Sequence, residues 1–222
     1  MIHLVTGANR GIGLEFVRRL LALGHTVHAT ARDPARASVL AGLTPHVHAL
    51  DVGDEGSIAR LAAALREVDV VINNAGTIGD EASPLGEQTL AGLSAAFAIN
   101  AAGPLLLTQA LLPAIGRGKR KLVVHITSRM GSIGDNSSGG YYSYRMSKAA
   151  LNMASKSLAL DLAPKGIISV VMHPGWVKTD MGGAGATLTP EESVRGMLKV
   201  IDGIDAKSSG KFYNYNGAEI AY

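Results

Sequence analysis

Three side chains in the second half of the sequence have the types and spacing of a proton-transfer site. Tyr144 and Lys148 lie four residues apart at the start of a predicted helix, and therefore on one face of it. A lysine ammonium near a phenol favours the phenolate and lowers its pKa from about 10 toward neutral pH. Tyr144 could then give a proton to a carbonyl oxygen or remove one from an alcohol. Ser128, just past the end of a predicted strand, could hold the same oxygen by a hydrogen bond.

Two neighbouring tyrosines compete for this role. Tyr141 has Arg145 four residues on, but an arginine exchanges no proton at neutral pH, and a pair of glycines before Tyr141 predicts that it precedes the helix. Tyr142 has Met146 at the same offset. The spacing therefore favours Tyr144.

A glycine-rich turn follows the first predicted strand and opens the first predicted helix. Its sequence is Thr6-Gly7-Ala8-Asn9-Arg10-Gly11-Ile12-Gly13. Glycines let the backbone approach a ligand closely, and the helix N-terminus offers free N–H groups to a pyrophosphate. The spacing differs from the usual Gly-x-Gly-x-x-Gly fingerprint, and such a turn can also be only a tight turn.

Arginines gather at the end of the second predicted strand. Arg32 ends that strand, Arg36 lies one helical turn onward, and Arg10 could reach the same point from the glycine-rich turn. Guanidinium groups bind phosphate in a forked geometry, so the three favour NADP, with its 2′-phosphate, over NAD. Asp33 leaves room for NAD, and a solvated Arg32–Asp33 pair is the alternative.

Polar residues also follow the third and fourth predicted strands. Asp51 could accept a bond from an adenine amino group, or could cap the helix that starts near Asp54. The segment Asn73–Gly76 would line the cofactor, or form an ordinary asparagine-glycine turn.

These motifs together resemble the short-chain dehydrogenase/reductase family. The resemblance rests on six features, in that family's order and spanning almost the whole chain: Thr6–Gly13, Asn73–Gly76, Asn100, Ser128, Tyr144-x-x-x-Lys148 and Pro174–Thr179. Within the family, Ser128–Ser132 and Gly139–Tyr142 are similar to the C-factor-like and sniffer-like carbonyl reductase branch.

The resemblance implies an NADP-dependent oxidoreductase with an Asn-Ser-Tyr-Lys tetrad. Tyr144 would be the acid/base, Ser128 would orient the carbonyl, Lys148 would bind the nicotinamide ribose, and Asn100 would hold a relay water at a break in its helix. The residues expected to bind the cofactor are Gly7, Asn9, Arg10, Gly11, Ile12, Gly13, Arg32, Arg36, Asp51, Val52, Asn73, Ala75, Gly76, Tyr144, Lys148, Pro174, Gly175, Val177 and Thr179. The alternatives are a non-catalytic NAD(P)-binding signalling protein on the same scaffold and an isomerase or dehydratase of the superfamily.

Strand and helix patterns alternate along the chain. The predicted strands are Ile2–Thr6, Thr26–Ala31, His46–Leu50, Val68–Asn73, Leu122–Thr127, Ile168–His173 and Phe212–Tyr215. The predicted helices are Gly11–Leu23, Pro34–Gly42, Asp54–Val68, Leu90–Ile115, Ser143–Ala163 and Pro190–Asp202. This alternation predicts one doubly wound α/β Rossmann domain over residues 1–222, with about seven parallel strands and helices on both faces. Ligands bind beyond the carboxyl ends of such strands, where the motifs fall.

Composition narrows the function classes. The chain is 47% hydrophobic and 18% charged, with a net charge of +3 and no cysteine, which excludes disulfides, thiolate catalysis and a disordered chain. One basic run, residues 117–121, lacks an aromatic platform or recognition helix, so we expect no nucleic-acid binding. The histidines have no carboxylate partner at ligand spacing, so we expect no metal site. The N-terminus has no signal-peptide pattern, and we expect a cytoplasmic protein.

The stretch Gln88–Gly116 contains no charged residue. It is long enough for a membrane span, but Asn100, Gly103-Pro104 and Pro113 interrupt it. In the family resembled, this helix packs against its symmetry mate. We therefore expect a homodimer or homotetramer through the Gln88–Gly116 and Ser143–Ala163 helices.

The substrate should be a small carbonyl or alcohol compound. The glycine-rich loop Thr179–Thr189 would be a lid over it or only a connection. The side chains expected to wall the pocket are Met130, Tyr141, Tyr142, Trp176 and Met181.

Overall fold

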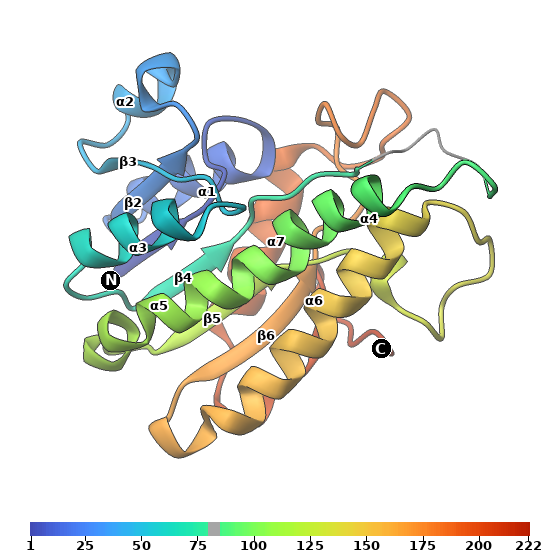
Figure 1. The fold of residues 1–222 in the computed structure, drawn as a ribbon. Coiled ribbons are helices and arrows are strands. Elements are labelled where there is room, and N and C mark those ends of the chain that lie inside the picture. Colours follow the sequence, from blue (N-terminus) through green and yellow to red (C-terminus); the bar gives the residue numbers. More distant parts are fainter. Residues whose placement is uncertain (80–84) are drawn as a thin grey trace.

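Seven parallel strands form the central sheet of the molecule (Figure 1). The structure, a computed structural model, describes residues 1–79 and 85–222. The strands are β1 (Ile2–Val5), β2 (Thr26–Ala31), β3 (Val47–Ala49), β4 (Val70–Asn73), β5 (Leu122–Ile126), β6 (Ile168–His173) and β7 (Phe212–Asn214). Their order across the sheet is β3-β2-β1-β4-β5-β6-β7, and every pairing is parallel. The fold-class prediction is confirmed.

Helices cover both faces of this sheet (Figure 1). The α-helices are α1 (Gly11–Ala22), α2 (Ser38–Ala41), α3 (Glu55–Ala64), α4 (Leu90–Phe97), α5 (Gly103–Arg117), α6 (Tyr142–Asp161) and α7 (Pro190–Asp202). The short 3-10 turns are η1 (Pro34–Arg36), η3 (Arg129–Gly131), η4 (Ala163–Lys165) and η5 (Ala206–Ser208), and a π-helical turn, η2, spans Ala98–Ala102.

The alternation of side chains along the strands creates two separate cores. Phe16 of α1 and Met197 of α7 pack with one set of strand side chains, while Leu61 of α3 and Leu111 of α5 pack with the other. Strands buried on both faces explain the unbroken apolar runs in the sequence.

The sheet reverses its winding between β1 and β4, which are neighbours although β2 and β3 come between them in sequence. In open parallel sheets the crevice for ligands lies at this point, outside the carboxyl ends of the strands. The glycine-rich turn after β1 and the segment after β4 meet there, since Thr6 Oγ1 accepts from the N–H groups of Asn74 and Ala75 (both 2.9 Å).

Two predicted helices are shorter than expected. The predicted helix Pro34–Gly42 is two short pieces, η1 and α2, because Ala37 leaves the helical region with φ −103° and ψ 49°. The predicted helix Asp54–Val68 ends at Ala64, where Leu65 turns extended and is buried. Apolar spacing alone does not show that the helix ends at Ala64, because Leu65 and Val68 both still pack into the core.

The uncharged stretch is broken by a π-helical turn. The predicted helix Leu90–Ile115 consists of α4, the turn Ala98–Ala102 and α5, and Asn100 is the central residue of that turn. By length and apolarity, Leu90–Arg117 passes as one candidate membrane span, with a mean hydropathy of 1.7. Leu107, Leu111 and Ile115 nevertheless pack into the core against the sheet, as in the core helix of a soluble protein.

Candidate active site

A cleft of about 1130 Å³ opens at the predicted edge of the sheet. Most of the predicted cofactor residues line it: Gly7, Asn9, Arg10, Gly11, Ile12, Gly13, Arg32, Arg36, Asp51, Val52, Ala75, Gly76, Tyr144, Lys148, Pro174 and Thr179. Asn73, Gly175 and Val177 lie outside this lining. Motifs up to 172 residues apart in the chain (Gly7 to Thr179) are therefore brought to one cavity by the strand ends.

The glycines of the turn after β1 are required by close backbone approach. Gly7 has φ +61°, and a Cβ there would lie 2.9 Å from Ala75 Cα. A Cβ at Gly13 would overlap the Gly7 carbonyl oxygen and lie 2.6 Å from Asn74 Nδ2. The helix α1 begins at Gly11 without a side-chain cap from Arg10. Its first turn thus presents backbone N–H groups at the cleft, which fits a pyrophosphate.

The arginines at this end of the cleft differ in their partners. Arg10 Nη1 lies 2.8 Å from Asp180 Oδ2, and both side chains are exposed. Within residues 1–79 and 85–222, Arg32 and Arg36 have no ion-pair partner, and Asp33 instead accepts from the Ala35 N–H (3.1 Å) as the cap of η1. The alternative of an Arg32–Asp33 pair is therefore not formed in this part of the chain. Two uncompensated guanidiniums fit a phosphate group.

The asparagine that lines the cleft after β4 is Asn74, a correction to the prediction of Asn73. Asn73 is buried, and its Nδ2 lies 3.3 Å from Thr108 Oγ1 and 3.2 Å from His125 Nδ1. Asn74 Nδ2 donates to the carbonyl oxygens of Thr6 (2.9 Å) and Gly7 (3.1 Å), and so fixes the glycine-rich turn. The signal that could have identified Asn74 is its place as the first residue beyond the strand.

Asp51 does not cap the helix that follows it. Its Oδ1 accepts from the Gly53 N–H (2.9 Å), whereas Asp54 caps α3 by accepting from Gly56 (3.0 Å) and Ser57 (3.1 Å). Asp51 thus remains at the cleft, where a carboxylate can accept from an amino group.

The segment after β6 meets the cleft through its ends rather than its middle. Pro174 and Thr179 line the cleft, but Val177 is buried and forms a parallel bridge with Leu188. Gly175 has φ +81° and packs against Leu188 and Tyr215. The resemblance could not show that Val177 is used for packing, since that depends on a partner eleven residues away.

Ser128, Tyr144 and Lys148 form one buried group, of which Tyr144 and Lys148 line the cleft and Ser128 lies outside its lining. The side chains of Ser128 and Tyr144 are hydrogen-bonded to each other. Lys148 Nζ lies 5.8 Å from the centre of the Tyr144 ring and donates to the Ile126 carbonyl oxygen (2.9 Å). Tyr141, with φ +49°, precedes α6 as expected, and its side chain is exposed.

Burial dominates the electrostatics of this group. It raises the pKa of Tyr144 above its ordinary value, and the hydrogen bond from Ser128 opposes this only in part. Burial also lowers the pKa of Lys148 to about 8. The direction of the Tyr144 pKa is opposite to the predicted one, because desolvation of a phenolate outweighs the hydrogen bond from Ser128. A tyrosine that stays protonated at neutral pH is a proton donor.

Asn100 is fully buried and does not line the cleft. Its Oδ1 accepts from the Thr77 N–H (2.8 Å), and its Nδ2 donates to the Thr77 carbonyl oxygen (2.7 Å) and to Ser147 Oγ (2.9 Å). Since Ser147 precedes Lys148 and Thr77 lines the cleft, Asn100 ties the cleft wall to the helix that carries Tyr144 and Lys148.

Of the side chains expected to wall a substrate pocket, Met181 alone lines this cleft. Trp176 is half exposed, and its Nε1 donates to the Gly182 carbonyl oxygen (2.8 Å). The Lys178 N–H donates to the Leu188 carbonyl oxygen (2.8 Å), so the loop 179–189 is closed on itself at its base.

In the described residues, no three His, Cys, Asp or Glu side chains converge as a metal site would require. His28 of β2, His48 of β3 and His46, just before β3, do gather, but as stacked rings, with His28 Nδ1 2.9 Å from His48 Nε2.

The fold and the cleft together define a class: dinucleotide-binding α/β proteins with a Ser, Tyr and Lys site. A family model described as short chain dehydrogenase matches residues 1–187. The chain belongs to this family of oxidoreductases.

Individual relatives are similar over most of the chain. The C-signal of Myxococcus xanthus is 53% identical over 155 residues, which are 70% of this chain and 93% of that protein. The NADPH-bound carbonyl reductase from chicken fatty liver superimposes with a TM-score of 0.92 at 39% identity, covering 99% of this chain and 98% of the other. The carbonyl reductase Sniffer of D. melanogaster gives 0.93 at 32% identity, with 100% and 98% coverage.

Proposed function

We propose that the protein is an NADP-dependent carbonyl reductase or alcohol dehydrogenase with Tyr144 as its general acid/base. The observation that carries the proposal is the buried Ser128–Tyr144–Lys148 group, whose Tyr144 and Lys148 line the same cleft as the glycine-rich turn, Arg32 and Arg36. The named function of the chicken and D. melanogaster structures, both carbonyl reductases, supports it. Cofactor cleft and catalytic group belong to one domain.

The chain's own residues divide the work of a carbonyl reduction. NADPH, when bound, supplies the hydride that the carbonyl carbon accepts. The Tyr144 hydroxyl gives its proton to the carbonyl oxygen, and the Ser128 hydroxyl holds that oxygen by a hydrogen bond. Lys148, still mostly protonated at neutral pH, stabilises the phenolate that Tyr144 becomes. Asn100 holds the cleft wall against α6 while this happens.

The decisive experiment follows NADPH absorbance with a panel of aldehydes, ketones and quinones. Replacing Tyr144 by Phe removes the proton donor and keeps the ring, so Tyr144→Phe should abolish turnover while leaving NADPH affinity within a few-fold. A Tyr142→Phe variant is the matched control, because that hydroxyl is outside the hydrogen-bonded group, and should keep full turnover. Substantial turnover in Tyr144→Phe would contradict the mechanism.

A second candidate is a non-catalytic nucleotide-binding signalling protein. The relative named C-signal, at 53% identity, favours it. A wild-type protein that binds NADPH but reduces nothing in the panel, and whose Tyr144→Phe variant behaves identically, would support this candidate.

Exposed apolar side chains on two helices suggest an assembly of identical chains. Leu90 and Phe97 of α4, and Met146, Met153 and Leu160 of α6, are all at least half exposed. Exposed apolar residues that lie together usually mark a surface that another protein covers. We therefore propose that the protein is cytoplasmic and forms a homodimer or homotetramer through the Gln88–Gly116 and Ser143–Ala163 helices. Light scattering should give two or four chains. Met153→Glu should reduce this to one, and Val39→Glu, at a half-exposed position of another surface, should not. A wild-type monomer would contradict the proposal.

A further inference from the structure

Residues 218–222 turn back along β7 and lie beside the loop that joins Ser128 to Tyr144. The Asn214 N–H donates to the Ala218 carbonyl oxygen, and the Ile220 N–H donates to that of Phe212 (both 2.8 Å). Ile220 is buried with Phe212. This antiparallel return brings positions 221 and 222 to residues 132–134.

Ser132 is the main contact between the two segments. It is buried, its hydroxyl donates to the Ala221 carbonyl oxygen (2.6 Å), and its oxygen accepts from the Asp135 N–H (3.1 Å). Nearby, the Gly134 N–H donates to the Tyr222 carbonyl oxygen (3.3 Å). The Ser132 hydroxyl thus joins the loop to the returning segment by hydrogen bonds to both.

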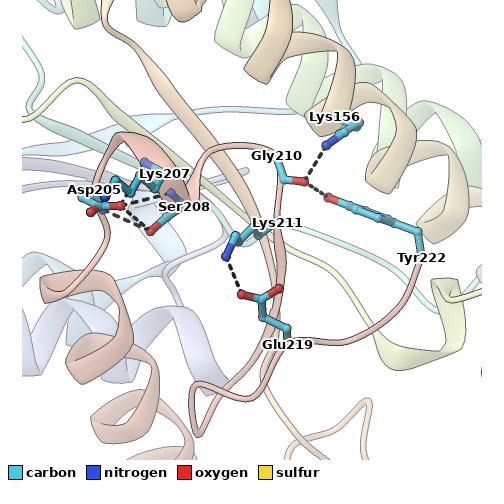
Figure 2. Close-up of polar contacts among 8 residues, drawn as sticks. All are labelled: Lys156, Asp205, Lys207, Ser208, Gly210, Lys211, Glu219 and Tyr222. Carbon is cyan, nitrogen blue, oxygen red and sulfur yellow. Dashed lines mark hydrogen bonds and ion pairs between the residues drawn. The ribbon is translucent and has the colours of Figure 1, made fainter.

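Tyr222 anchors the segment on its other side (Figure 2). Its hydroxyl donates to the Gly210 carbonyl oxygen (2.9 Å), and Lys156 Nζ of α6 donates to the same oxygen (3.4 Å). The ring lies 5.7 Å from the ring of Phe212. Gly210, two residues before β7, and the Phe212 ring of β7 therefore hold Tyr222 in place, and Lys156 of α6 shares the Gly210 oxygen with it.

The base of the loop is in direct contact with the catalytic group. A Cβ at Gly131 would lie 2.8 Å from the Lys148 carbonyl carbon, so the two backbones touch. The Gly131 carbonyl oxygen accepts from Asn152 Nδ2 of α6 (3.1 Å), and Ser128 Oγ accepts from the Met130 N–H (3.1 Å). A shift at residues 131–132 would therefore move Ser128 against Lys148.

The outer part of the loop is held separately. Arg145 of α6 donates to the carbonyl oxygens of Gly139 (3.1 Å) and Met130 (3.4 Å) and to Ser138 Oγ (2.8 Å). Residues 133–140 are exposed. The returning segment is thus a further attachment of the loop, in addition to Arg145 and Asn152 of α6.

We propose that residues 218–222 clamp the loop 129–141, with Ser132 as the positioning residue, and that this clamp sets how tightly the site holds a carbonyl substrate. The substrate part of this statement rests on the proposed function. The clamp itself does not, because it follows from contacts within the chain.

The first test is amide hydrogen exchange on the full-length protein. Ser132→Ala removes the hydroxyl, and exchange in residues 129–141 should speed up about fivefold, the equilibrium effect of losing one ordinary hydrogen bond. Glu219→Gln is the matched control: it breaks the Lys211–Glu219 ion pair of the same segment (Figure 2) without touching the loop, and should leave this exchange unchanged. Unchanged exchange in Ser132→Ala would overturn the clamp.

The second test is steady-state kinetics with the best carbonyl substrate of the panel. In Ser132→Ala, KM for the carbonyl should rise about fivefold, while the NADPH dissociation constant stays unchanged. Faster exchange with an unchanged KM would overturn the positioning role. If the wild type reduces no carbonyl but exchange responds as expected, the clamp stands and the proposed function alone is refuted.

A milder variant covers the case in which Ser132→Ala does not fold. Tyr222→Phe removes only the bond to Gly210 and keeps the ring and the backbone contacts to the loop. It should move exchange and KM in the same direction by a smaller factor, and no change in either would overturn the clamp.

Discussion

Individual side chains at the cleft show how burial can reverse an expectation drawn from charge. The four-residue spacing of Tyr144 and Lys148 correctly indicates that they meet, but it says nothing of how dry their surroundings are. Both side chains are buried, and burial favours the neutral form of each. It raises the pKa of Tyr144 and lowers the pKa of Lys148 to about 8. The pair therefore enters a reduction with the proton already on the tyrosine.

Cofactor choice is also decided by single residues. Arg32 lines the cleft without an ion-pair partner in the described residues. Arg32→Ala should weaken NADPH binding by about 10- to 100-fold, the usual effect of losing a hydrogen bond to a charged group. Binding of NADH, which lacks the 2′-phosphate, should change little, and fluorescence titration of both cofactors measures the difference. Arg18→Ala, on the exposed side of α1, is the control. Tighter binding of NADH than NADPH by the wild type would refute the arginine argument.

These residues also show which parts of the site can be predicted from the sequence. Glycines and arginines at strand ends could be assigned to the cleft, because parallel strands all end at one edge. The choice between Asn73 and Asn74 could not be made, since it depends on which side chain β4 turns into the core beside His125. The Arg10–Asp180 contact joins residues 170 apart and has no local signal at all.

At the scale of elements, helix α7 is defined by its ends. Its predicted range, Pro190–Asp202, agrees with the structure because a capping box starts it: Thr189 Oγ1 accepts from the Glu192 N–H (3.2 Å), and Glu192 Oε2 accepts from the Thr189 N–H (2.8 Å). Its far end is closed by Arg120, whose Nη2 donates to the carbonyl oxygens of Ile201, Asp202 and Ile204. One member of the basic run 117–121 thus caps a helix that is distant in sequence.

Thr189→Ala should therefore destabilise the protein by about 1 kcal/mol, the usual effect of removing an N-terminal cap. For a chain of this length, that corresponds to a fall of about 3 °C in Tm, measured by calorimetry. Thr187→Ala is the matched control, since the Thr187 side chain is exposed and its hydroxyl has no hydrogen bond in the described residues. Equal Tm values for the two variants would contradict the capping argument.

Other elements could be predicted only in outline. The segment from Leu90 to Ile115 has helical apolar spacing throughout, yet the turn Ala98–Ala102 adds a π-helical step at Asn100. Hydrophobic spacing does not predict this turn, because the apolar residues on both sides of it also fit one continuous α-helix. At this turn the side-chain amide of Asn100 forms hydrogen bonds to Thr77 and Ser147.

Across the whole molecule, buried histidines link stability to pH. Burial lowers the pKa of His3 and His125 to about 3, and that of His28 and His173 to about 4, from 6.5. A histidine depressed in this way contributes fully above the unfolded pKa and loses its contribution as pH falls toward the folded value. Each of His3, His125 and His173 should lower the free energy of unfolding by about 1.4 kcal/mol per pH unit below 6.5, and the partly exposed His28 should lower it by less.

Urea unfolding at a series of pH values from 7 to 4.5 tests this directly. The wild type should lose stability steadily below pH 6.5. His125→Asn should be less steep by about 1.4 kcal/mol per pH unit, because one titrating group is gone. Parallel curves for wild type and His125→Asn would refute the assignment.

The central position of β1 also has a consequence for how the chain is made. β1 leaves the ribosome well before one of its two neighbours, β4, which begins 65 residues after Val5, at Val70. During that interval β1 can pair with β2, and β2 with β3, but the other edge of β1 keeps its backbone N–H and C=O groups unpaired. Open edges of buried strands invite contacts with other chains. Between the synthesis of Val5 and that of Asn73, the nascent protein therefore depends on whatever shields that edge.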